Sequence, residues 1–348
     1  MTGTAEATML KPLRGFQPFE THHCVTGSMR HIYEFHRCAI SEDLLLGLGA
    51  GVGFVYWHMK GTTPFLGGRV NVGRPGEEGL EKTAGKRTGV RVERFQTEST
   101  RKAEKVVLEL LSAGEPVMVQ VDMGFLPYFH FSKKYHFGGH VVVVAGCDPE
   151  VQKVLVADRD GKLHPVSVKE LTRARSSKFK PFPPRNTWYN FDFKDKRPPK
   201  PEELRQAIRE VVTGMLRPPI ANLGVKGIRT AAARVRLWPK LMDKEQLHYT
   251  CFNTFIFIDA TGGTGGGLFR YMYARFLNEA EGILGDARLA DISEQVRRIG
   301  DLWQNAAQVF KEAAAASDPS FLLHEAAALL LNIADHEQAA WVKLDPLG

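Results

Sequence analysis

Residues 138–158 read GGHVVVVAGCDPEVQKVLVAD, in which two valine-rich runs flank a turn at Pro149. β-branched residues favour strands and proline suits the turn between them, so this stretch predicts an antiparallel hairpin. His140 stands at the start of the first run, and Asp158 directly follows the second. Residues that lie opposite each other in such a hairpin point to the same side of the sheet. We therefore expect the imidazole and the carboxylate to share a face.

A cysteine lies far upstream, in the sequence THHCVTGS of residues 21–28. A helical pattern follows it, which places Cys24 near a helix start, where unpaired backbone N–H groups and the helix dipole favour a thiolate. A cysteine, then a histidine, then an acid is the order found in papain-like enzymes. The order predicts Cys24 as nucleophile, His140 as base and Asp158 as the acid that orients the histidine.

Two further residues are candidates for this site. Asp160 has the same facing parity as Asp158 and is the alternative orienting acid. Gln17 precedes Cys24 at about the spacing at which papain-like enzymes keep a glutamine for the oxyanion hole. The simpler interpretation makes Cys24 a small buried residue, His140 a hydrogen-bonded core histidine and Asp158 the cap of a turn. The presence of all three in this order favours catalysis.

The composition bounds the class of protein. At 348 residues, 43% of them apolar, the chain can form one large domain or two ordinary ones with a real core. No apolar stretch has the length of a membrane span and the N-terminus lacks a signal-peptide layout, so no membrane association is expected. The net charge of +7 permits an acidic partner. No nucleic-acid recognition motif is visible, so nucleic-acid binding is not expected.

Cysteine and histidine spacing argue against a metal or disulfide framework. The four cysteines are Cys24, Cys38, Cys147 and Cys251. None forms a C-x-x-C pair, which favours free thiols in a reducing, cytoplasmic location. The histidines between residues 130 and 140 have no carboxylate or thiolate at ligand spacing, and His324-Glu325 does not continue into an H-E-x-x-H zinc helix. We expect no metal.

Hydrophobic periodicity predicts helices at 29–37 and 100–112, and strands at 54–58, 116–122 and 251–259. Ser41-Glu42-Asp43 is expected to cap a short helix. The aromatic segment from Met123 to Gly139 is expected to form a loop or lid over a cleft. The chain is thus predicted to have an α/β N-terminal half and a mostly helical C-terminal half.

This pattern indicates an α+β fold in three parts. Residues 1–172 are expected to form a papain-like catalytic domain and residues 201–348 a mostly helical C-terminal domain. Residues 173–200 are rich in Lys, Arg and Pro and are expected to be a linker or a surface crossing. Basic residues such as Lys178 and Lys180 would steer an acidic partner, or would simply belong to a solvated linker.

Two glycine-rich runs look like phosphate loops. The run Gly47–Gly53 follows a predicted helix and lacks G-x-G-x-x-G spacing. The run Gly262–Gly267 is expected between the strand at 251–259 and a helix, the right context for an anion site. It lacks both the dinucleotide spacing and the Lys-Ser/Thr pair of a P-loop. Tight packing of strand on helix is its expected role, and no cofactor is predicted.

Three segments carry a resemblance to a known family: His22-His23-Cys24, residues 41–49 and residues 139–144. In this order they resemble the N-terminal domain of the butirosin biosynthesis protein H family. Residues 262–271 resemble the C-terminal domain usually fused to it. The resemblance implies a papain-like fold with a Cys-His-Asp triad. It assigns the same roles to Cys24, His140 and Asp158 as their order does.

The resemblance also implies a reaction, because the member that gives the family its name is an acyltransferase. That member moves an acyl group from a carrier-protein thioester to the amine of an aminoglycoside. For this chain we expect transfer from an acyl carrier protein, or another acyl-thioester donor, through acyl-Cys24 to a small-molecule amine. One alternative is a papain-like amidase or peptidase with water as acceptor. Another is a non-catalytic scaffold that retains the fold.

Overall fold

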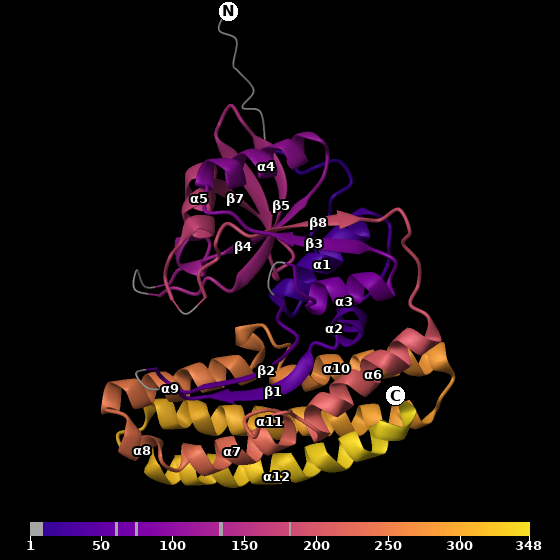
Figure 1. Cartoon of the computed structure of the whole chain (residues 1–348). Coiled ribbons are helices and arrows are strands. Elements are labelled where there is room, and N and C mark those ends of the chain that lie inside the picture. The colour runs from indigo at the N-terminus through magenta and orange to yellow at the C-terminus, as the bar shows by residue number, and fades with distance from the viewer. Residues whose placement is uncertain (1–9, 60–61, 74–75, 132–134, 181) are drawn as a thin grey trace, which may run out of the picture. The chain divides into compact units, whose positions relative to one another are not determined.

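The computed structural model has an α+β architecture with a mostly helical C-terminal half (Figure 1). It describes residues 10–59, 62–73, 76–131, 135–180 and 182–348. The chain packs as two compact units. The first contains the chain up to Glu42 together with Val90–Lys196, and the second contains Asp43–Gly89 and Arg197–Gly348.

The first unit is built on a six-stranded sheet with the strand order β3-β8-β4-β5-β6-β7, in which all neighbours are antiparallel. Its strands are β3 (Arg91–Phe95), β4 (Val117–Val121), β5 (His140–Asp148), β6 (Lys153–Ala157), β7 (Leu163–Ser167) and β8 (Trp188–Asp192). The hairpin predicted about Pro149 is confirmed as β5–β6.

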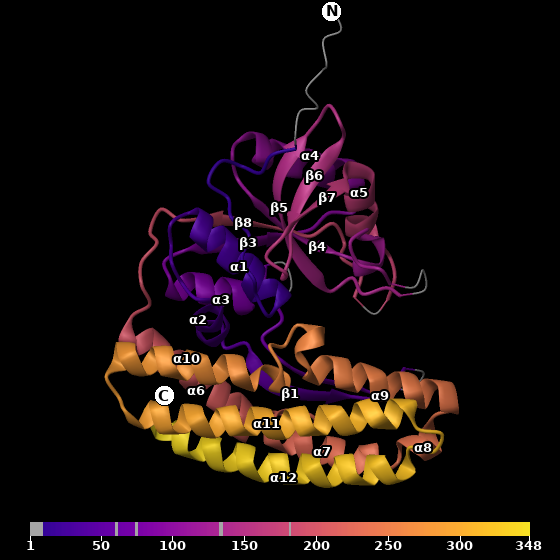
Figure 2. The ribbon, with the colours of Figure 1, turned by 180° about the vertical axis from the view of Figure 1, so that it is seen from behind.

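Helices cover this sheet according to the alternation of its side chains. In β4, Val117, Val119 and Val121 belong to an apolar core that also includes residues of α4 (Thr100–Ser112) and α5 (Val168–Ser176). Because successive strand residues point to opposite faces, Met118 lies on the other face. Helix α1 (Cys24–Phe35) packs against β5 and β4 there. Figures 1 and 2 show α4 and α5 together along the strands and apart from α1.

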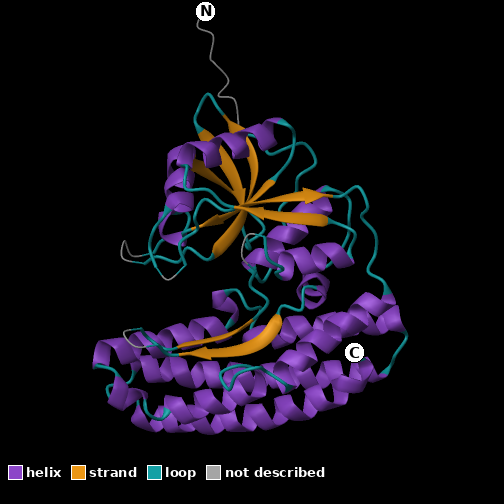
Figure 3. Ribbon diagram, in the orientation of Figure 1, coloured by secondary structure: helices purple, strands orange, loops and turns teal. Residues whose placement is uncertain are grey.

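The second unit consists of long helices and a two-stranded antiparallel sheet that lies along them (Figure 3). Its strands are β1 (Val52–Trp57) and β2 (Phe65–Arg69). Its helices are the remainder of α2 (Glu42–Leu48), α3 (Leu80–Arg87), α6 (Pro201–Leu216), α7 (Gly224–Val235), α8 (Trp238–Leu241), α9 (Lys244–Ile258), α10 (Arg270–Leu284), α11 (Arg288–Ala315) and α12 (Ser320–Leu344). No helix in the described ranges is both long and apolar enough to span a bilayer.

A buried polar network holds the helices of this unit together. The fully buried Glu337 accepts hydrogen bonds from Arg270 Nε at 2.8 Å, from Trp303 Nε1 at 2.8 Å and from Trp341 Nε1 at 2.6 Å. Arg270 also donates to the backbone oxygen of Gly53 in β1, at 2.9 Å. Glu337 therefore fixes three helices and one strand in a single arrangement, and its charge is compensated.

The strand predicted at residues 251–259 is wrong, because this segment lies within helix α9 and its C-cap. A short apolar run does not distinguish a buried strand from a buried helix, and α9 is apolar around most of its circumference. The run Gly262–Gly267 therefore follows a helix instead of a strand. The predicted packing of strand on helix is therefore also wrong, and the close contact is with helix α11 instead: a Cβ on Gly267 would lie 2.7 Å from the backbone of Gly300. Gly47 is similarly close to the ring of Phe276.

The boundaries of the two units differ from the predicted domains 1–172, 173–200 and 201–348. Residues 173–196 are part of the first unit and not a linker, because β8 pairs with both β3 and β4 inside the sheet. Residues 43–89 belong to the helical unit, where β1 packs against α7 and α6. The proline- and lysine-rich composition of residues 173–200 therefore gave no indication of β8, a strand inside the sheet.

Candidate active site

Helix α1 begins at Cys24, earlier than the predicted start at residue 29, so Cys24 does lie at a helix start. His23 is the N-cap residue, and its side chain accepts a hydrogen bond from the backbone N–H of Thr26. The half-buried Cys24 thus occupies the first helical position. Backbone N–H groups in this turn lack partners within the helix, so the position favours negative charge on the sulfur or on a bound oxygen.

The turn before Cys24 is fixed by a buried carboxylate that the sequence did not indicate as part of the site. Glu42, the first residue of α2, accepts hydrogen bonds from the backbone N–H of His22 at 2.9 Å and of His23 at 2.7 Å. The hydroxyl of Thr26 donates to the same carboxylate at 3.2 Å. These bonds satisfy donors that precede the helix and hold the entry to α1 rigidly.

The chain leading into α1 is also joined to the chain that leaves β6. Glu20 and Asp160 form an isolated antiparallel bridge, and the N–H of Thr21 donates to the carbonyl of Arg159 at 2.9 Å. The Arg159 guanidinium donates to the carbonyl of His22 at 3.2 Å. These contacts place the N-terminus of α1 beside the end of the hairpin.

His140 and Asp158 meet inside the first unit. The register of the hairpin places Val143 opposite Ala157, so Asp158 lies just beyond the paired strand and on the face that carries His140. The distance between His140 Nε2 and Asp158 Oδ2 is 2.7 Å, and both side chains are almost fully buried. The His140 side chain also hydrogen bonds to Cys24. The structure thus brings together the three residues that the sequence singles out.

The interaction of His140 with Asp158 shifts the pKa values of the two groups in opposite directions. Burial lowers the pKa of His140, but the charge and hydrogen bond of Asp158, together with those of Cys24, raise it from 6.5 to about 9. Burial raises the pKa of Asp158, while the charge and hydrogen bond of His140 outweigh it and lower the pKa to about 2. At neutral pH the ring is therefore an imidazolium, and an imidazolium beside sulfur favours the thiolate.

Two residues of the segment predicted as a loop or lid contact this pair, and residues 132–134 of that segment lie outside the described residues. The hydroxyl of Tyr128 donates to Asp158 Oδ2 at 2.8 Å. The ring of Phe129 meets the ring of His140 edge to face, with centroids 5.7 Å apart. The aromatic composition of the segment was the only indication of these contacts in the sequence, because Tyr128 and Phe129 lie outside any helix or strand whose periodicity could place them beside His140.

Both ends of this segment are clamped by Asp122, a fully buried residue at the end of β4. Its Oδ1 accepts from the backbone N–H groups of Gly124 at 3.0 Å and Phe137 at 3.1 Å. Its Oδ2 accepts from the Ser177 hydroxyl at 2.6 Å and lies 2.9 Å from His136 Nδ1. Asp122 therefore ties the two ends of the segment, at Gly124 and Phe137, to the end of β4.

The other predicted site residues lie elsewhere. Asp160 pairs with His164, at 3.0 Å from its Nε2, and does not contact His140. Gln17 is exposed on the segment that leads into α1. The segment that carries Gln17 is held by His31 of α1, whose Nε2 lies 2.9 Å from the N–H of Phe19. Burial lowers the pKa of His31 to about 4, so this ring is neutral and accepts the bond.

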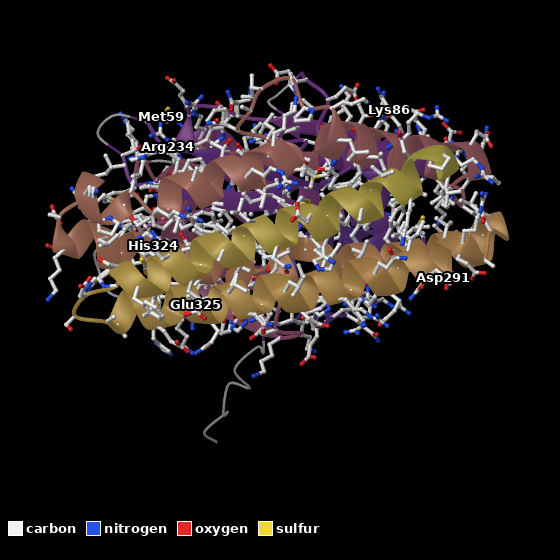
Figure 4. All side chains as sticks on the ribbon, turned by 90° about the horizontal axis from the view of Figure 1, so that it is seen from below. Met59, Lys86, Arg234, Asp291, His324 and Glu325 are labelled. Atoms are coloured by element: carbon white, nitrogen blue, oxygen red, sulfur yellow. The ribbon has the colours of Figure 1, made fainter. Side chains whose placement is uncertain are left out.

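The remaining cysteines have different surroundings. Cys38 and Cys251 are buried, and Cys147 is half-buried. Burial raises the pKa of each of these thiols, to about 12 for Cys251. His324 and Glu325 are exposed on α12 (Figure 4). Among the described residues, no three His, Cys, Asp or Glu side chains are placed to hold a metal ion.

Two family models match the chain. Residues 23–159 match the model described as "Butirosin biosynthesis protein H, N-terminal". Residues 169–344 match "Domain of unknown function (DUF4872)". The chain therefore matches the butirosin biosynthesis protein H family over residues 23–159, and its C-terminal half belongs to the family of that domain of unknown function. This confirms the resemblance found in the sequence, and no curated protein matches the chain. The first match includes Cys24, His140 and Asp158, so the site lies within the part that defines the family.

Proposed function

We propose that the chain is a biosynthetic acyltransferase with a papain-like fold and a Cys24-His140-Asp158 triad. The observation that carries this proposal is the buried His140 ring, bonded on one side to Asp158 and on the other to a cysteine at the start of a helix. This combination is the arrangement that activates cysteine nucleophiles. The family's name supports a role in the synthesis of a secondary metabolite.

The proposed reaction has two half-steps. The Cys24 thiolate attacks the carbonyl carbon of an acyl thioester, and the C–S bond to the donor breaks as His140 gives its proton to the departing thiol. The acyl group is then held as a thioester on Cys24. In the second half-step an amine attacks this thioester, His140 takes the amine proton, and the Cys24 thiolate leaves. Because Asp158 engages Nε2, the nitrogen that exchanges protons is Nδ1.

Negative charge develops on the carbonyl oxygen in both half-steps. Backbone N–H groups in the first turn of α1, including that of Cys24, would donate to this oxygen, since helix N-termini present such donors. Gln17 is proposed as a second donor, because the segment that carries it is tied to α1 by His31. Gln17 is exposed in the free protein, so this role requires its side chain to turn toward the site when substrate binds.

The proposed donor is an acyl carrier protein or another acyl thioester, and the proposed acceptor is a small-molecule amine. Lys178 and Lys180 are exposed on either side of Phe179, whose ring stacks on His136 at a centroid distance of 3.4 Å. These two lysines therefore lie beside the segment that packs over His140. Carrier proteins are generally acidic, so this basic pair would attract one to the site.

The test is acylation of Cys24 followed by mass spectrometry. Wild-type protein mixed with an acyl-N-acetylcysteamine thioester should gain one acyl group on Cys24, and an added amine should remove it as an amide. Cys24→Ala should gain none, whereas Cys147→Ser, a change at another half-buried thiol, should behave as wild type. Release of the acyl group by water alone would indicate an amidase or peptidase. Absence of any Cys24 acylation would refute the nucleophile and favour a scaffold.

A further inference from the structure

We propose that Tyr128 is a positioning residue that sets the orientation and protonation of His140 through Asp158. The inference rests on the proposed triad and adds a fourth member to it. The motif Cys-His-Asp contains no tyrosine, and Tyr128 lies in a segment without regular secondary structure. Its role follows only from where its hydroxyl lies.

The Asp158 carboxylate is fixed by three donors. Its Oδ2 accepts from the Tyr128 hydroxyl at 2.8 Å and lies 2.7 Å from His140 Nε2, so one oxygen is shared by the two groups. Its Oδ1 accepts from the backbone N–H of Arg159 at 2.8 Å. With all three bonds made, the carboxylate plane cannot rotate without breaking one of them. That plane determines the direction in which the imidazole points.

Tyr128 is itself held firmly. Its ring stacks on the ring of His164, with centroids 3.9 Å apart, and His164 in turn pairs with Asp160. It also packs against Phe129, at a centroid distance of 4.8 Å. Burial, then the charge and hydrogen bond of Asp158, raise the pKa of the Tyr128 hydroxyl well above 10. The hydroxyl is therefore always a donor in this position.

The donation has a definite electrostatic consequence. A hydroxyl that shares its proton with a carboxylate takes up part of the negative charge, and so weakens the attraction of that carboxylate for an imidazolium. The titratable and charged groups around the pair are Arg159 and Asp160 after β6, His164 of β7, and His31 and the Cys24 sulfur on α1. None of these changes when the Tyr128 hydroxyl is removed. The pKa of His140 should then rise, while the loosened carboxylate should orient the ring less well.

The experiment compares Tyr128→Phe with Tyr271→Phe. Tyr271 also donates its hydroxyl to a carboxylate at 2.8 Å, that of Asp301, but it does so in the helical unit. Titration of the His140 ring by NMR of labelled histidine gives its pKa, with His140→Gln used for assignment. Acylation of Cys24 by an N-acetylcysteamine thioester gives the rate. A third protein carries 3,5-difluorotyrosine at position 128, which makes the hydroxyl a stronger donor.

For Tyr128→Phe we expect the His140 midpoint to rise by about half a pH unit and acylation to slow by about tenfold, typical of losing one hydrogen bond to a charged group. Difluorotyrosine should lower the midpoint, a reversal that loss of packing alone would not produce. Tyr271→Phe should match the wild type in both measurements. Equal midpoints in all four proteins would overturn the role of Tyr128 and leave the triad intact. Absence of Cys24 acylation in the wild type would instead refute the triad itself, and with it both proposals.

Discussion

Replacing Asp158 by asparagine should produce a loss of activity that depends on pH in a specific way. Burial alone would lower the pKa of His140, and the Asp158 charge is the largest influence that raises it to about 9. At pH 8 a pKa of about 9 leaves about 90% of the rings protonated, whereas the ordinary 6.5 would leave about 3%. Asp158→Asn should therefore slow Cys24 acylation at least about thirtyfold at pH 8.

The difference should shrink as the pH falls, because a ring with a pKa of 6.5 is about 75% protonated at pH 6. The assay is rapid-quench mass spectrometry of acyl-Cys24 between pH 6 and 9, with a small thioester as donor. Asp160→Asn is the matched control, since Asp160 lies two residues away and pairs with His164 instead of His140. A loss of equal size at every pH would show that Asp158 does not act through the protonation of His140. A comparable loss of activity in Asp160→Asn would show that the orienting role does not belong to Asp158 specifically.

Three further outcomes follow from the structure. Glu42→Gln should lower the free energy of unfolding by about 1–3 kcal/mol, because an amide cannot accept all three of the bonds that Glu42 accepts, and urea denaturation measures this. Glu337→Ala should lower the free energy of unfolding by about 3–5 kcal/mol in the same assay, because it leaves the buried Arg270 without its partner. Asp335→Ala, which breaks an exposed ion pair with Arg229, should lower it by less than about 1 kcal/mol. Equal losses in the two variants would contradict the buried network. Acyl transfer from a carrier protein should weaken with salt, while transfer from a small thioester should not; charge reversal at Lys178 and Lys180 without effect would exclude this surface as the docking site.

Local patterns in the sequence were sufficient for several elements. The helix predicted at residues 100–112 coincides with α4, since apolar residues at helical spacing need only one neighbouring surface to cover them. The valine runs around Pro149 gave the β5–β6 hairpin, and its period of two placed His140 and Asp158 on one face. The position of Cys24 at the start of α1 was likewise predicted from its neighbours. For 251–259 the same kind of pattern failed, because an apolar run fits a buried helix as well as a strand.

The sequence by itself determined the order of cysteine, histidine and acid, the hairpin that joins the last two, and the family. The tertiary structure alone decided that Asp158 and not Asp160 reaches His140, that Glu42 fixes the entry to α1, and that Tyr128 shares the Asp158 carboxylate. It also decided that residues 43–89 pack with the helical unit. The physical reason is that periodicity records which face of an element is buried. Hydrogen bonds between residues distant in sequence depend on how loops close over that face, and loops have no periodic pattern of apolar residues from which their positions could be predicted.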